Sequence, residues 1–70
     1  MNKKEFYKKY KERANEEIWR LEFETRFLER AKLASKEEII SLNNTIKDYT
    51  KAIRILKKKI ELIDEILKGL

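Results

Sequence analysis

The side chains of this chain that could do chemistry are amines, guanidinium groups, carboxylates and a few hydroxyls. Its 70 residues include 18 Lys and Arg and 13 Asp and Glu, but no His and no Cys. The chain therefore has no thiolate nucleophile, no imidazole base that titrates near neutral pH, and no soft or imidazole ligand for a metal. We expect no enzyme activity, no metal site and no cofactor.

The carboxylates have a simpler explanation than acid/base catalysis. Glu16 and Glu22 each stand four residues before an Arg, the favourable order for helical ion pairs worth about 0.2–0.5 kcal/mol each. Gly69 is the only glycine, so the sequence has no glycine-rich loop to hold a phosphate.

Four cations in the second half follow a helical spacing. Lys47, Lys51, Arg54 and Lys58 are separated by four, three and four residues, which places them on one helix face about 16 Å long. We name this set the basic ridge. A shorter N-terminal set comprises Lys4, Lys8 and Lys11, with Tyr7 and Tyr10 beside them. Such rows can bind phosphates, with rings stacking on bases, although lysine rows more often solvate the outside of a coiled coil.

Three aromatic residues in the first half are spaced by four. Trp19, Phe23 and Phe27, which we name the aromatic stripe, alternate with arginines at positions 20, 26 and 30. Buried aromatics and Arg dominate the binding energy of protein interfaces. The stripe therefore predicts an interface, either with a second copy of the chain or with another protein.

The residues that position these groups predict helices throughout. No Gly or Pro occurs between residues 1 and 68, and helix-forming Glu, Lys, Arg, Leu, Ile and Ala dominate. Capping boxes at Asn2–Glu5 and Ser35–Glu38 mark two helix starts, and Gly69 marks a stop. We expect one all-α domain, with a helix over about 3–33, a turn at about 33–35 and a helix over about 36–68.

The second predicted helix carries a heptad pattern typical of a coiled coil. Its apolar residues alternate spacings of three and four; we name them the seam, and they are Ile39, Leu42, Ile46, Tyr49, Ile53, Leu56, Ile60, Ile63 and Leu67. Additional apolar residues beside the seam between 52 and 66 widen this face. A wide face contacts more than one neighbouring helix, so the pattern favours a bundle in which the seam is an oligomer interface.

The first predicted helix has two apolar faces. One carries Phe6, Tyr7, Tyr10, Ala14, Ile18, Leu21, Leu28 and Ala31, and the aromatic stripe lies well away from it. One partner helix cannot cover both faces. We therefore expect an antiparallel helical hairpin that assembles into a homo-oligomeric bundle, a dimer or larger.

The hydrophobic pattern also permits a different fold. The heptad frame of the first half continues in phase through Ser35 to Leu42, so one continuous helix about 100 Å long, in a parallel coiled coil, is an alternative. The Ser35 capping box and the similar lengths of the two halves favour the hairpin. The poor helix formers at 41–45 are expected to stay helical, because the seam runs through them in phase.

Composition and length also bear on location and function. The charged N-terminal residues leave no room for a signal-peptide core, and no apolar run approaches the roughly 18 residues needed to span a bilayer. We expect a basic cytoplasmic protein with no membrane contact. A chain this short, without disulfides or metal, needs partners for stability. The expected function is a small accessory protein for protein binding: an adaptor, assembly factor or inhibitor that occupies a partner's surface.

Two other functional classes stay open on the sequence alone. A symmetric bundle would display the basic ridge more than once, which would suit RNA or DNA binding. A pocket between subunits lined by Tyr and Lys would suit a small anionic, nucleotide-like ligand.

Overall fold

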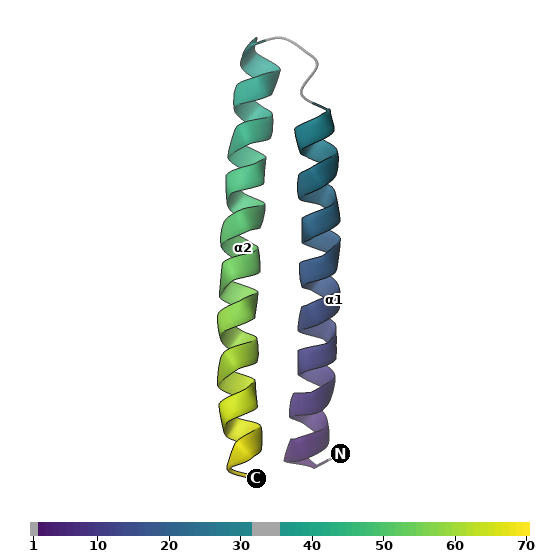
Figure 1. Ribbon diagram of the computed structural model, residues 1–70, viewed down its shortest axis with the longest axis vertical. Coiled ribbons are helices and arrows are strands. Elements are labelled where there is room, and N and C mark those ends of the chain that lie inside the picture. Colours follow the sequence, from purple (N-terminus) through teal and green to yellow (C-terminus); the bar gives the residue numbers. More distant parts are fainter. Residues whose placement is uncertain (1, 32–35) are drawn as a thin grey trace.

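The chain forms two helices packed side by side. The computed structural model describes residues 2–31 and 36–70, in which α1 spans Lys3–Arg30 and α2 spans Lys36–Lys68, with no strand in these ranges. Both termini lie at the same end of the molecule, which we name the open end (Figure 1). The prediction of an all-α two-helix hairpin is confirmed.

The alternative of one continuous helix is wrong. The molecule measures 52 × 15 × 14 Å, about half the length of the rod that 70 helical residues would make. The backbone also leaves the helix at Ala31, whose N–H donates to the carbonyls of Phe27 (3.0 Å) and Leu28 (3.2 Å). The predicted turn at 33–35 and the Ser35 capping box lie outside the described residues.

Local signals explain the other helix ends. Asn2 caps α1, because its side-chain Oδ1 accepts a hydrogen bond of 2.9 Å from the backbone N–H of Glu5. α2 ends at Lys68, where the N–H of Gly69 donates to the carbonyl of Ile66 at 3.1 Å. Gly69 stops the helix as predicted, but without the positive φ that a glycine cap often adopts.

α2 is continuous through its weakest stretch. Helix covers all of residues 41–45, as predicted. The Thr45 hydroxyl donates to the carbonyl of Ser41 at 3.1 Å, and this back-bond satisfies the hydroxyl without breaking the helix. Both helices therefore run the length of the hairpin.

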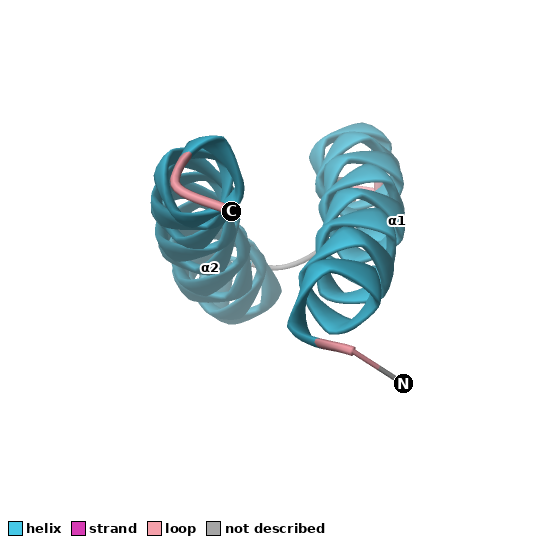
Figure 2. Ribbon diagram, turned by 90° about the horizontal axis from the view of Figure 1, so that it is seen from below, coloured by secondary structure: helices cyan, strands magenta, loops and turns pink. Residues whose placement is uncertain are grey.

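The core between the helices is small. Only Ala14, Ile18 and Leu21 of α1 and Ile63 of α2 are buried among the described residues. The seam residues other than Ile63 are half-buried, so the seam is the side of α2 that faces α1. Viewed along its length, the molecule is a single layer of two helices (Figure 2). The seam that the sequence predicts between subunits therefore lies within one chain.

One ion pair joins the helices near the open end. Lys11 Nζ donates to Asp64 Oδ1 at 2.6 Å, with side chains 37% and 45% exposed. A pair this exposed stabilises by about 1 kcal/mol at most, but it shows that the Lys11 turn of α1 lies beside the Asp64 turn of α2. Over the described residues, neither helix has an apolar stretch long enough to cross a membrane.

Candidate interaction surfaces

The hairpin leaves more large apolar side chains exposed than it buries. In the described residues nine are exposed: Phe6, Tyr10, Trp19, Phe23, Phe27, Ile40, Ile55, Leu62 and Leu70. Apart from Ile40 they belong to α1's outer side or to the half of the hairpin nearer the open end. Large contiguous exposed apolar surface marks interaction sites.

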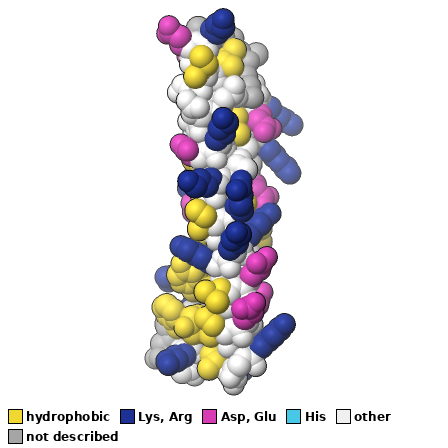
Figure 3. Space-filling model, turned by 90° about the vertical axis from the view of Figure 1, so that its left-hand side faces the viewer, with side chains coloured by type: hydrophobic (Ala, Val, Ile, Leu, Met, Phe, Trp, Pro, Cys, Tyr) yellow, Lys and Arg dark blue, Asp and Glu magenta, His cyan; other side chains and the backbone are white. Residues whose placement is uncertain are grey.

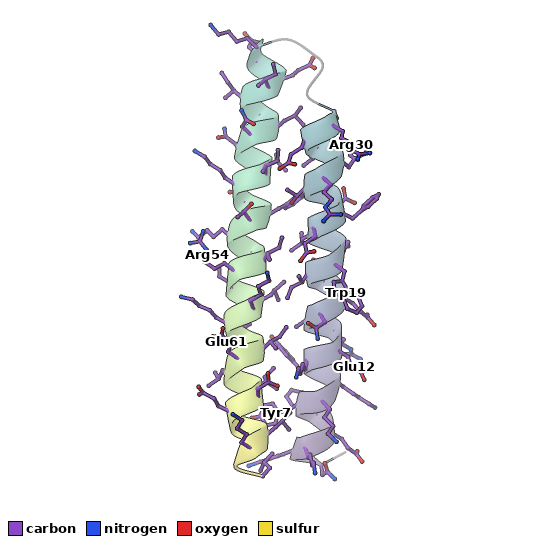
Figure 4. The ribbon with its side chains drawn as sticks, in the orientation of Figure 1. Tyr7, Glu12, Trp19, Arg30, Arg54 and Glu61 are labelled. Atoms are coloured by element: carbon purple, nitrogen blue, oxygen red, sulfur yellow. The ribbon has the colours of Figure 1, made fainter. Side chains whose placement is uncertain are left out.

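The aromatic stripe lies on the side of α1 that is turned away from α2. Trp19, Phe23 and Phe27 are 65%, 67% and 57% exposed, and Figure 4 shows Trp19 pointing outward from the hairpin. The opposite side of α1 supplies Ala14, Ile18 and Leu21 to the core. α1 therefore has the two apolar faces expected from the sequence, and α2 covers only one of them.

The arginines around the stripe differ in their partners. Arg20 donates to both carboxylate oxygens of Glu17, at 2.6 and 3.1 Å. This hydrogen bond lowers the pKa of Glu17 and raises the pKa of Arg20. Arg26 and Arg30 make no ion pair within residues 2–31 and 36–70. Together with Phe23, Phe27 and Glu29, they line an open depression of about 470 Å³.

A second apolar surface lies at the open end. Phe6, Tyr7 and Tyr10 of α1 and Leu62, Ile63 and Ile66 of α2 line a cavity of about 330 Å³. Among the described residues that line it, Lys59 is the only charged one. The rings of Phe6 and Tyr7 meet edge to face, with centroids 5.4 Å apart. The view onto the outer side of α2 shows apolar side chains gathered near this end (Figure 3). We name the lining residues the open-end patch.

The members of the N-terminal set predicted to contact anions differ in their surroundings. Tyr7 and Tyr10 line the mainly apolar open-end cavity, while the charge of Lys11 is taken up by Asp64. Lys4 and Lys8 remain exposed. Anion contact by this set stays a prediction.

The basic ridge is intact and faces solvent. Lys47, Lys51, Arg54 and Lys58 are all exposed, and none makes an ion pair within the described part of the chain. Arg54 projects from α2 away from α1 (Figure 4), and Figure 3 shows Lys and Arg side chains along this side. The ridge and the aromatic stripe therefore lie on opposite sides of the hairpin.

Sequence reasoning missed the open-end cavity and the Lys11–Asp64 pair. Both depend on which residues of α1 and α2 lie level, and the two residues of that pair are 53 positions apart. One sequence feature could have indicated the cavity: the apolar residues beside the seam between 52 and 66. The end of this band lies beside Phe6 and Tyr7 in the structure. In the described residues, no group of three Asp or Glu side chains is placed to hold a metal.

Comparisons with protein-family models, curated proteins and solved structures find no match. Evidence for the function of this chain therefore comes from its own exposed surfaces: the aromatic stripe, the open-end patch and the basic ridge.

Proposed function

We propose that the protein is a non-enzymatic, oligomeric interaction protein in the cytoplasm. Copies of the hairpin join, and the assembly acts by binding a partner protein's surface as an adaptor, assembly factor or inhibitor. The observation that carries this proposal is the contrast, over residues 2–31 and 36–70, between nine exposed large apolar side chains and four buried residues. A chain of this size with so small a core needs a second chain to cover apolar surface.

The contacts between α1 and α2 support an antiparallel, coiled-coil-like hairpin as the unit that assembles. Lys11, near the start of α1, bonds to Asp64, near the end of α2. Glu22 and Thr25, further along α1, line a depression with Ile53, further back along α2. In such a hairpin the seam is largely occupied within the chain, so assembly uses the surfaces left over: the aromatic stripe and the open-end patch.

Stability is expected to depend on protein concentration. Only the assembled state covers the exposed apolar side chains, so mass action favours folding at higher concentration. A hundredfold increase in concentration should raise the thermal midpoint by about 5–10 °C. The measurement is far-ultraviolet circular dichroism during heating, paired with mass by light scattering.

A monomeric mass with a midpoint that does not move over this range would contradict the proposal. The hairpin would then gain no stability from a second copy, and its exposed apolar groups would need another explanation.

Nucleic-acid binding is a second candidate, favoured by the unpaired, exposed cations of the basic ridge. The ridge offers no Asn, Gln or aromatic side chain at its four positions, so it would contact phosphates without reading bases. Two hairpins joined through their α1 outer faces would present two ridges, one on each outer side.

Binding through the ridge should be weak and strongly salt-dependent. Four phosphate contacts per chain predict a slope of about −3.6 in log affinity against log salt, so raising salt from about 50 to 200 mM should weaken binding about a hundredfold. The double variant Lys51→Glu, Arg54→Glu should lose most of this binding in fluorescence anisotropy with a labelled oligonucleotide. Its control, Lys36→Glu with Lys68→Glu, makes the same change in net charge at the ends of α2. Equal losses in both variants, or tight binding that resists salt, would contradict ridge-specific contacts.

A further inference from the structure

The charges on the outer face of α1 change sign across the aromatic stripe. Glu12 and Glu16 precede the stripe, whereas Arg26 and Arg30 lie toward its other end. All four are exposed, and none makes an ion pair within the described residues. In Figure 4, Glu12, Trp19 and Arg30 follow one another along the side of α1 that is turned away from α2.

These side chains share one sector of the helix. At about 100° per residue, the two glutamates, the two arginines and the aromatic stripe fall within a sector of about 100°. The buried residues Ala14, Ile18 and Leu21 lie on the opposite side. Between Glu12 and Arg30 the outer face of α1 is therefore a continuous strip with an acidic end, an aromatic centre and a basic end.

Apart from Phe27, the residues of the strip are arranged symmetrically about one position in the sequence. Position 21 is the midpoint of three pairs of residues: Glu12 and Arg30, Glu16 and Arg26, and Trp19 and Phe23. In two antiparallel helices related by a twofold axis level with position 21, the two members of each pair lie level, one on each copy. Each carboxylate is then level with a guanidinium of the second copy, and Trp19 is level with Phe23 of the second copy.

We propose that a second copy of this chain binds the outer face of α1 antiparallel, with the twofold axis level with position 21. This inference rests on the proposed self-assembly and identifies the surface that carries it. The contact runs from Glu12 to Arg30, about 27 Å of helix, and covers all three rings of the aromatic stripe.

The charges discriminate between the second copy and other occupants. A parallel second copy would set Arg against Arg and Glu against Glu, which costs affinity. A phosphate chain lying along the strip would be attracted at Arg26 and Arg30 but repelled at Glu12 and Glu16. A strip with opposite charge at its two ends is complementary to its own reversed copy.

Charge reversal tests both the surface and its orientation. An acidic variant carries Arg26→Glu and Arg30→Glu, and a basic variant carries Glu12→Arg and Glu16→Arg. Each alone places like charges opposite each other, so its self-association in sedimentation velocity should weaken about a hundredfold. An equimolar mixture of the two variants should form a heterodimer, because every contact is then complementary. A chain with all four substitutions should self-associate as the wild type does.

Two controls separate loss of the interface from loss of the fold. Circular dichroism should show equal helix content in every variant. Lys51→Glu with Arg54→Glu makes the same change in charge as the acidic variant on the opposite side of the hairpin, and it should keep wild-type self-association.

The outcomes distinguish this interface from self-assembly in general. If the acidic and basic variants still associate like the wild type, or if their mixture forms no heterodimer, the antiparallel α1 contact is wrong while assembly through another surface stands. If the wild-type chain is monomeric at all concentrations, both the interface and the proposed self-assembly fail.

Discussion

Replacing Ile63 by Asp is expected to unfold the hairpin. Ile63 is the one buried residue of α2, with 5% of its surface exposed, and it lines the open-end cavity with Tyr7 of α1. A carboxylate at this position would be desolvated without a partner, which costs several kcal/mol. Small proteins have only about 5–15 kcal/mol of stability in total, and only four of the described residues form the core of this hairpin. Far-ultraviolet circular dichroism should show most of the helix signal lost at room temperature.

Leu62→Asp is the matched control for this experiment. Leu62 is the preceding residue on the same helix, but 57% of its surface is exposed. The substitution loses at least as much helix propensity as Ile63→Asp, because Leu is a better helix former than Ile, while the new carboxylate remains hydrated. Its helix content should stay close to that of the wild type. Equal helix content in both variants would mean that the side of α2 facing α1 has been misidentified.

The helices could be predicted from sequence because their signals are local. The chain lacks Gly and Pro up to residue 68, and Asn2 can hydrogen-bond Glu5 within its own turn. The seam is equally local, since a heptad spacing selects one side of a helix whatever it packs against. These signals define α1, α2 and the inner side of α2.

The pairing of the helices could not be derived with the same certainty. Periodicity gives the direction in which a side chain points, but it does not identify the helix that it meets. The seam could equally have packed on another chain, and the frame running through Ser35 to Leu42 also suited one long helix. In the structure the seam of α2 packs on α1 of the same chain. The aromatic stripe, on the other side of α1, therefore stays exposed.

The candidate surfaces also differ in this way: a surface on one helix could be predicted from the sequence, whereas a surface made by both helices could not. The basic ridge and the aromatic stripe each lie on one helix, and both appear where their spacing placed them. The set of Lys4, Lys8 and Lys11 with the nearby tyrosines also lies on one helix, but the pairing of Lys11 with Asp64 across the hairpin was not predicted. The open-end patch combines residues of both helices, so it becomes visible only once the two are placed side by side.

Replacing Phe23 by Asp should separate the assembled chains and leave each hairpin folded. Phe23 is 67% exposed in the single chain, so the hairpin itself loses little packing when the ring is removed. In the proposed dimer Phe23 lies beside Trp19 of the second copy, at the centre of the interface. Central aromatic residues of this kind contribute about 2–4 kcal/mol, so the dissociation constant should rise roughly 30-fold to a thousandfold.

Trp19 reports this change directly, because it is the only tryptophan and is 65% exposed in the single hairpin. On dilution of the wild type, its fluorescence should shift to longer wavelength and become easier to quench with acrylamide as the copies separate. Phe23→Asp should give the exposed spectrum at every concentration, with unchanged helix content. Ile40→Asp, at a site 57% exposed and outside the aromatic stripe and the open-end patch, should follow the wild-type curve. A Trp19 spectrum that stays exposed in a wild-type oligomer of proven mass would instead leave the stripe free for a different protein, and assembly would then depend on the open-end patch.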